Sequence, residues 1–479
     1  MNKLILIRSL LFSFLTVCLV ACSDDEDEFY TGTDVGVQVF DSQVYRPADL
    51  TEAFSRSGML TDNGVEEAWQ QQLLRGTFDA LLADRIHDLD RYYHQVHQES
   101  GYLSLRQWQV ESYCFKYKTV SAAGEPIMLS GRVTFPAMKN GSELLMNSLT
   151  LHIHYYMNHL LEAPTASLSP AVLRVFFNSA IIEPDLEGYG VTGDRIPCGI
   201  AFKQQARQNI DCVWAALQVM KSRGVKLMHG GHTTLWGLSL GAPQAIATAQ
   251  YCEEQLTQQQ QEAINLTSVL VDSGPYLLGR ILDFWDKNPS VNASLICRLL
   301  MFIHGFNKEY LEGYDPKDFC AEWMHTYQVN FKGKDCSLYE AIRDCGGDED
   351  VFDLWPEAMP NNKVSNCLAS DMLLPDGRLN RENPKTQAFI NILTKCGDVG
   401  TWLPKASVYI SHGTEDNYIP FEQAQAFYEQ IKGGKHVEFK AATGGLMERV
   451  MGVHQGCTLN VLIAMILFEE PADAHKNLP

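Results

Sequence analysis

Residues 233–242 read Thr-Thr-Leu-Trp-Gly-Leu-Ser-Leu-Gly-Ala and contain the motif Gly-x-Ser-x-Gly, centred on Ser239. An apolar run typical of a strand leads into the motif, and a helix-forming stretch, 242–253, follows it. A serine on such a sharp strand-to-helix turn projects its hydroxyl, and the flanking glycines remove side chains that would clash in the turn. The helix behind the turn adds backbone N–H groups and the positive end of its dipole. This stretch therefore predicts that Ser239 is a nucleophile.

The chain around this motif alternates short apolar runs with helical patterns from about residue 147 onward, which predicts an α/β fold with a mostly parallel sheet and helices on both faces. A helix is expected over 202–221, where apolar residues recur at helical spacing, and Gly224 would end it. Residues 108–135 alternate around a Gly- and Pro-containing turn and predict an antiparallel hairpin, whereas 65–97 has the pattern of amphipathic helices. The expected parallel strands are 149–154, 180–183, 233–236, 268–271, 407–411 and 437–440.

A serine hydroxyl is a poor nucleophile and needs a base that a third group holds in place. Residues 408–420 read Val-Tyr-Ile-Ser-His-Gly-Thr-Glu-Asp-Asn-Tyr-Ile-Pro and place acidic residues in a loop after a strand. This stretch resembles the His-Gly-x-x-Asp-x-x-x-Pro segment by which α/β-hydrolases present their acid, and the resemblance implies that Asp416 is the carboxylate. Glu415 is its nearest competitor, and Asp272, which follows another strand, is the alternative. We expect His412 to make only a structural hydrogen bond at the end of its strand.

The base is predicted from its place in the chain. His454 follows the last expected strand and lies 38 residues after Asp416, which gives the order Ser, Asp, His. His436 comes too early, and His475 lies in a polar tail. His454 is therefore the expected base.

Attack of a serine on a carbonyl carbon leaves a negative charge on the carbonyl oxygen, and backbone N–H groups can stabilise this oxyanion. The first expected donor is the N–H of Leu240. The resemblance to α/β-hydrolases implies that the second donor comes from the loop after the first strongly apolar parallel strand, where Tyr155 is the candidate and Tyr156 follows it. His152 and His154 end that strand as a His-x-His pair, but no partner motif accompanies them. The sequence therefore predicts no metal site and no organic cofactor.

These motifs resemble those of the α/β-hydrolase superfamily over residues 115–479. Besides Gly-x-Ser-x-Gly, they include His-Gly-x-x-Asp-x-x-x-Pro at 412–420 and Pro-Asp-x-x-Gly-x-Gly at 184–190. The pattern is most similar to secretory lipase-type esterases with a helical cap, except that Ala242 stands where many of those lipases have glycine. The resemblance implies an α/β-hydrolase fold and acyl transfer from an ester to water, with Ser239, His454 and Asp416 as the catalytic triad.

The N-terminus has the pattern of an export signal. Lys3 and Arg8 precede an apolar run too short to span a membrane, and Leu-Val-Ala-Cys closes it at Cys22. The segment resembles a bacterial lipoprotein signal, which implies removal of residues 1–21 and lipid on Cys22. The acidic run 23–28 resembles a surface-export signal of one group of Gram-negative bacteria, or is a plain solvated tether. We therefore expect an exported lipoprotein of the outer membrane, at the cell surface and anchored through lipid alone.

The net charge limits the expected binding partners, and the number of cysteines limits the expected disulfides. The formal net charge of −20 argues against a nucleic-acid partner. Of 13 cysteines, Cys18 would leave with the signal and Cys22 would carry lipid, so 11 remain, an odd number that forbids complete pairing. Five of these lie between Cys320 and Cys396, where either one or two disulfides or buried free thiols are expected.

The expected organisation is a signal peptide (1–21), a flexible acidic tether (22–45), a first part of the hydrolase core with N-terminal helices (46–276), an inserted helical cap (277–404) and a second part of the core (405–479).

The leading function is hydrolysis of a small-molecule, lipid or carbohydrate ester. A prolyl-oligopeptidase-type peptidase would use the same triad, but the roughly 100 residues before the core cannot form its propeller. The third interpretation is a non-catalytic lipoprotein that binds glycans at the cell surface. The complete set of triad residues argues against it.

Overall fold

The computed structural model describes residues 35–45, 109–137, 144–153, 163–166, 168–287, 294–305, 310–345, 351, 354, 356, 364–416, 418–443, 453–468 and 470–478. Several sequence predictions lie outside these residues. They are the signal peptide, the lipidation site Cys22, the amphipathic helices at 65–97, and the residues His154, Tyr155 and Tyr156.

A nine-stranded sheet forms the centre of the protein, in the order β1-β2-β3-β5-β4-β6-β7-β10-β11. The pairs from β1 to β5 are antiparallel, and every pair from β5 to β11 is parallel. This confirms the predicted α/β class with a mostly parallel sheet. The bounds are β1 Gln38–Tyr45, β2 Val110–Val120, β3 Pro126–Pro136, β4 Leu144–Ile153, β5 Ser179–Pro184, β6 Val225–Leu238, β7 Leu266–Asp272, β10 Ser407–Gly413 and β11 His436–Ala442.

Three strands differ clearly from the sequence prediction. β4 begins at Leu144, five residues before the expected start at 149. Residues 38–45, at the end of the expected flexible tether, form β1 and pair antiparallel with β2. Their β-branched and aromatic residues suit an edge strand. β6 begins at Val225, eight residues before the expected start at 233, because the polar and glycine-containing run ahead of Thr233 has no apolar pattern although part of it pairs with β4.

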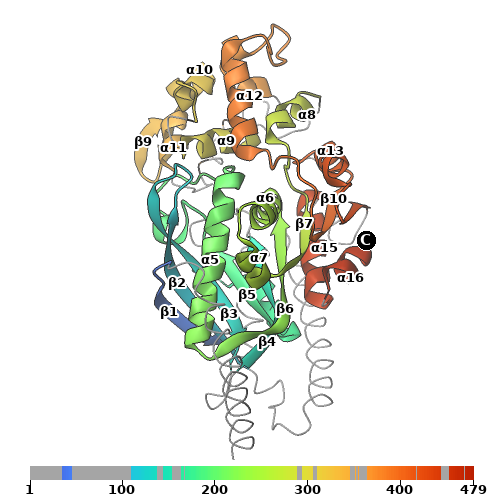
Figure 1. Ribbon diagram of the computed structural model, residues 1–479. Helices are drawn as coiled ribbons and strands as arrows, with labels where there is room; N and C mark the ends of the chain where they lie inside the picture. The colour runs from blue at the N-terminus through green and yellow to red at the C-terminus, as the bar shows by residue number, and fades with distance from the viewer. Residues whose placement is uncertain are drawn as a thin grey trace, which may run out of the picture.

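One face of the sheet packs against α5 (Phe202–Ser222) and α6 (Gly241–Glu254), and Figure 1 shows α5 running along the strands. The helix α5 forms as predicted and is followed by Gly224 in the left-handed conformation, at φ 74°. Gly131 of β3 allows α5 to come close, because a Cβ there would lie 2.6 Å from Cys212 Sγ. The apolar side chains of this face make up most of the core.

The alternate side chains of the same strands carry hydroxyl and charged groups that are also buried. Thr150 bonds to Ser179 across β4 and β5 at 2.9 Å, and Thr234 bonds to Ser268 across β6 and β7 at 3.0 Å. The helix α15 (Val453–Leu467), which precedes the short last helix α16 (Pro471–Lys476), contacts β7, β10 and the 3-10 helix η5 (Pro170–Phe177). Arg174 of η5 donates to the carbonyl of Met465 at 3.0 Å, so a buried guanidinium ties these two segments together.

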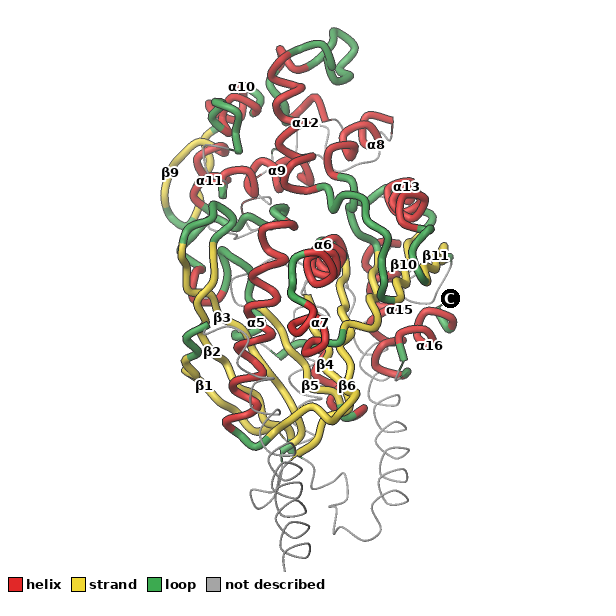
Figure 2. The backbone as a smooth tube through the Cα atoms, in the orientation of Figure 1, coloured by secondary structure: helices red, strands yellow, loops and turns green. Residues whose placement is uncertain are grey.

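Residues between β7 and β10 gather beyond the end of the sheet at which β6 finishes, as Figures 1 and 2 show. They include helices, as expected, and also a hairpin whose two-residue turn, Lys332-Gly333, has φ 52° and 79°. Positive φ at both positions suits the turn type that joins tightly paired strands. The elements are α8 Ile281–Lys287, α9 Ser294–His304, α10 Glu322–Thr326, β8 Gln328–Phe331, β9 Lys334–Ser337, α11 Leu338–Asp344 and α12 Pro384–Gly397.

The ten cysteines whose side chains the structure describes are all buried, and none of these ten is in a disulfide. These ten include the five from Cys320 to Cys396, so thiols, and not disulfides, occupy these five positions. Within the described part of the chain, no helix has the length and apolar character needed to cross a bilayer.

Glu183 of β5 is fully buried, and its Oε1 accepts hydrogen bonds from His152 Nδ1, at 3.0 Å, and from Ser169 Oγ. Burial alone would raise the pKa of Glu183, but the His152 hydrogen bond and the nearby charges of His152 and Arg132 outweigh it and lower the pKa below the ordinary 4.5. The carboxylate therefore stabilises the fold above about pH 4.5, and this stabilisation is lost as the pH falls through the folded-state pKa.

We predict that Glu183→Gln lowers the free energy of unfolding by about 2 kcal/mol at pH 7, because a charge-assisted hydrogen bond is lost. The difference from the unsubstituted protein should shrink as the pH falls below 4.5. Urea denaturation at pH 7 and pH 4 measures both quantities, with Glu262→Gln on the exposed surface of α7 (Gln258–Ile264) as the control. A difference that grows in acid would contradict the assignment.

Candidate active site

Ser239 lies between the last residue of β6 and the first residue of α6. Its φ is 50°, the left-handed region, which costs a residue other than glycine roughly 1–3 kcal/mol. The turn is held on both sides, because the N–H of Ser239 donates to the carbonyl of Asp272 at 2.9 Å and its carbonyl accepts from Ala242 at 3.0 Å. The predicted strand–turn–helix context of Ser239 is thus present.

The glycine at the start of the motif is required by close packing. A Cβ at Gly237 would lie 2.2 Å from the carbonyl oxygen of Gly241 and 2.9 Å from Cα of Ala242. The helix therefore returns onto the strand at a distance that only glycine permits. Ala242, the departure from the lipase pattern, is fully buried beside Gly274, where a Cβ would approach the Ala242 methyl to 2.7 Å. Gly274 thus leaves the space that the methyl of Ala242 occupies.

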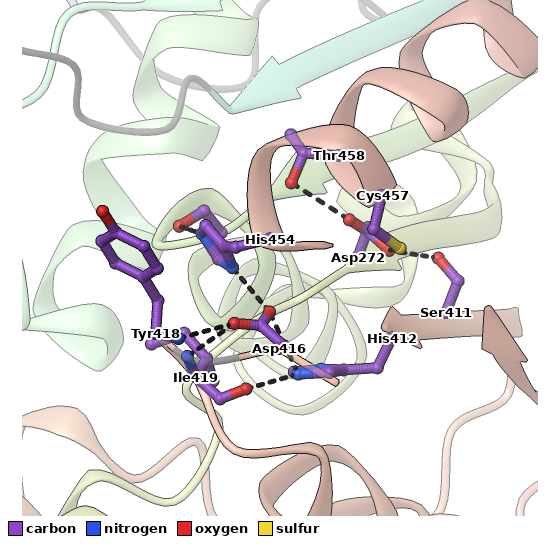
Figure 3. Close-up of polar contacts among 10 residues, drawn as sticks. Asp272, Ser411, His412, Asp416, Tyr418, Ile419, His454, Cys457 and Thr458 are labelled. Atoms are coloured by element: carbon purple, nitrogen blue, oxygen red, sulfur yellow. Dashed lines mark hydrogen bonds and ion pairs between the residues drawn. The ribbon is translucent and has the colours of Figure 1, made fainter. Parts of the chain in front are cut away.

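The three predicted triad residues meet at this turn. Ser239 Oγ lies 3.1 Å from His454 Nε2, and His454 Nδ1 lies 2.6 Å from Asp416 Oδ2. Figure 3 shows the carboxylate of Asp416 facing the imidazole of His454. Since a carboxylate only accepts, Nδ1 carries the proton, and Nε2 is left to accept from the serine hydroxyl. This is the arrangement needed to remove a proton from Ser239.

The loop after β10 prepares Asp416 as an acceptor. Its Oδ1 takes hydrogen bonds from the backbone N–H groups of Tyr418 and Ile419, both at 2.9 Å. Burial would raise the pKa of Asp416, but the charge and hydrogen bond of His454, the charge of His412 and the Ile419 N–H lower it below its usual range. Asp416 therefore presents a negative charge to His454 Nδ1.

His412 makes the structural hydrogen bond expected of it. Its Nε2 donates to the carbonyl of Ile419 at 2.8 Å, which closes the loop around Asp416. The same nitrogen lies 3.5 Å from Asp416 Oδ2. The side chain is fully buried and contacts Asp416 on the side away from His454 (Figure 3).

The competing residues do not take part in this chain of hydrogen bonds. Glu415 is exposed. His436 is exposed and pairs with Glu438 at 2.8 Å, whereas His475 is buried and its Nε2 lies 2.9 Å from the carbonyl of Ile410. Each of the two other histidines weighed as the base therefore has a separate structural contact.

Asp272, the alternative acid, has a different set of partners (Figure 3). Its carboxyl accepts from Ser411 Oγ at 2.6 Å and from Cys457 Sγ and Thr458 Oγ1, both at 3.2 Å. Burial raises the pKa of Asp272, because these hydroxyl and thiol donors offset only part of the desolvation. Asp272 therefore joins β10 to α15, the helix that carries His454. The sequence did not predict this link, because the link depends on how α15 packs against the sheet.

The expected oxyanion donors are placed in part. Leu240 is the N-cap residue of α6, so its N–H lies at the positive end of that helix. Ile153, the last residue of β4, pairs with Gly237 in the sheet, so β4 ends beside the turn of Ser239. Tyr155 and Tyr156 themselves lie outside the described residues.

The segment 184–190 is held by a buried carboxylate. Asp185 accepts from Ser130 Oγ at 2.5 Å and from the backbone N–H of Thr165 at 3.1 Å. Gly190, at φ 55°, leaves room for it, since a Cβ there would lie 2.1 Å from Asp185 Oδ2. This part of the lipase-like pattern therefore fixes loop structure.

Within the part of the chain that the structure describes, no group of three His, Cys, Asp or Glu side chains could hold a metal ion. His152, half of the His-x-His pair, bonds to Glu183, and its ring lies 4.7 Å from that of Trp236.

Comparison with solved structures agrees with this architecture. A cell-wall-degrading esterase, LipA, from Xanthomonas oryzae superposes with a TM-score of 0.59 and 16% identity over 91% of this chain and 97% of its own. A putative hydrolase from Legionella pneumophila superposes with a TM-score of 0.54 and 16% identity over 76% of this chain and 90% of its own. The chain has an α/β-hydrolase fold. No protein-family model matches the sequence, and no curated protein matches it.

The two buried aspartates provide a direct comparison. We predict that Asp416→Asn lowers kcat for ester hydrolysis by about 10⁴-fold, because the amide would hold the imidazole in the wrong tautomer. Asp272→Asn should lower kcat far less, because Asp272 bonds to α15 and not to His454. Steady-state kinetics of both variants test this, and an equal loss in the two would contradict the assignment of the acid to Asp416.

Proposed function

We propose that this protein is a serine hydrolase that cleaves carboxylic esters through an acyl-enzyme. The observation that carries the proposal is the continuous chain from Ser239 Oγ to His454 Nε2, at 3.1 Å, and from His454 Nδ1 to Asp416 Oδ2, at 2.6 Å. Further support comes from the fold and from the esterase described as degrading rice cell walls among the similar structures.

Acylation follows from this geometry. Ser239 Oγ attacks the ester carbonyl carbon while its proton passes to His454 Nε2, and Asp416 offsets the charge of the imidazolium that forms. Backbone N–H groups of Leu240 and Tyr155 stabilise the oxyanion, and each such donor is typically worth about 10²- to 10³-fold in kcat. The imidazolium then returns the proton to the alcohol oxygen as the carbon–oxygen bond breaks. Water repeats the sequence and releases the acid, and these steps require neither an organic cofactor nor a metal ion.

The substrate belongs to the neutral esters of small molecules, lipids or carbohydrates. The net charge of −20 would repel an anionic polymer, which argues against nucleic acid. The segment between β7 and β10 lies beyond the end of the sheet at which β6 finishes (Figure 1), and we propose that this segment selects the acyl and alcohol groups.

We predict that a fluorophosphonate probe labels the protein and that Ser239→Ala abolishes both labelling and hydrolysis of short-chain p-nitrophenyl esters, with a loss of at least about 10³-fold. Ser273→Ala is the matched control, because Ser273 is also a buried serine with φ 50°. Unchanged labelling of the Ser239 variant would remove this serine from the mechanism. Faster cleavage of peptidyl p-nitroanilides than of esters would favour a peptidase, and labelling without turnover of either class would favour a binding protein.

The protein is also proposed to be exported and anchored in the outer membrane, at the cell surface, by lipid on Cys22. The support is the sequence of the N-terminus, where a positive segment and a short apolar run end in Leu-Val-Ala-Cys. Two lipid chains or more on one cysteine give stable membrane attachment without a spanning helix.

We predict that Cys22→Ala moves the protein from the membrane fraction to the soluble fraction and prevents the mass increase that lipid causes. Cys18→Ala, in the segment that would be removed, should leave both properties unchanged. Fractionation and mass spectrometry of the two variants measure this. Retention of the Cys22 variant in the membrane with unaltered mass would exclude the lipid anchor.

A further inference from the structure

Tyr418 contacts both members of the acid–base pair. Its backbone N–H donates to Asp416 Oδ1 at 2.9 Å. Its ring stacks on the imidazole of His454, with the ring centres 5.4 Å apart and the planes inclined by 23°. Figure 3 shows the ring of Tyr418 beside His454, with Asp416 below them. One residue therefore supports the acid through its backbone and covers the base with its side chain.

The stacking changes in strength during the proposed reaction. The face of an aromatic ring carries partial negative charge, and it attracts a cation that lies within about 6 Å of its centre. His454 is neutral before it takes the serine proton and cationic afterwards. The Tyr418 ring therefore interacts more strongly with the imidazolium than with the imidazole, and an interaction that grows toward the transition state lowers the barrier.

We propose that Tyr418 is a positioning residue for the base, whose ring holds the imidazole of His454 between Ser239 and Asp416 and stabilises its protonated form. This inference rests on the proposed function, because it assigns Tyr418 a part in the same proton transfer. The geometry that carries it is the stacked contact together with the hydrogen bond from Tyr418 to the carboxylate that holds the other side of His454.

Other titratable groups around His454 are the same in any variant at position 418. Asp416 and His412 come from β10 and its loop, Asp272 from the end of β7, and Cys457 from α15 itself. A change in the titration of His454 on substitution of Tyr418 therefore reports the aromatic contact.

The experiment compares Tyr418→Phe with Tyr418→Leu, since both variants keep the backbone N–H that donates a hydrogen bond to Asp416. Leucine removes the aromatic face and keeps apolar bulk, so we expect kcat to fall about three- to tenfold with little change in KM. Loss of an interaction that favours the cation lowers the pKa of His454, so the acidic limb of the kcat profile should move to lower pH by about half a unit. Phenylalanine should retain both kcat and the profile.

A second readout does not depend on turnover. The pKa of His454 is followed by proton NMR of its ring, assigned by the signal that disappears in His454→Gln, in the unsubstituted protein and in both Tyr418 variants. A lower pKa in the leucine variant alone supports the inference, even where no ester is hydrolysed and the proposed function fails. An unchanged pKa in a folded leucine variant, or an equal loss of kcat with phenylalanine and leucine, overturns it.

Discussion

The backbone reversal at Ser239 is the constraint on which the rest of the site depends. It combines a serine at φ 50° with a return of α6 onto β6 that leaves no room for a Cβ at Gly237. β6 lies between β4 and β7 in the sheet, so the reversal has a neighbouring strand end on each side. The carbonyl of Asp272 on β7 accepts the N–H of Ser239, and β4 ends at Ile153 beside Gly237. A parallel sheet therefore brings to one point groups that are far apart in sequence.

Two buried carboxyl groups near this point are distinguished by their surroundings. Asp416 faces two backbone N–H groups and two imidazoles, and its pKa is lowered. Asp272 faces hydroxyls and a thiol, and burial raises its pKa because these donors and the charge of His412 offset only part of the desolvation. The same functional group thus serves as a fixed negative charge beside His454 and as a structural link beneath the helix that carries it.

The fold class and the pairing of Ser239, His454 and Asp416 could be anticipated because each rests on a local pattern. The strand–turn–helix signal around Ser239 and the order of the three motifs do not depend on details of packing. The stacking of Tyr418 on His454 could not be anticipated, because it depends on where α15 meets the loop after β10. The extension of β6 back to Val225 was hidden for a similar reason, since its polar residues pair with β4 without an apolar pattern. The role of Tyr155 stays a prediction.

The buried thiols affect how the chain must mature. Burial raises the pKa of Cys198 and of Cys212, so in the folded protein these thiols stay protonated and behave as small apolar groups. Their protection exists only once the core has closed, and an unfolded chain would present the same sulfurs to any oxidant. In an oxidising compartment, the core must therefore close before these thiols form incorrect disulfides. A chain that folds before its thiols are oxidised needs no disulfide isomerase.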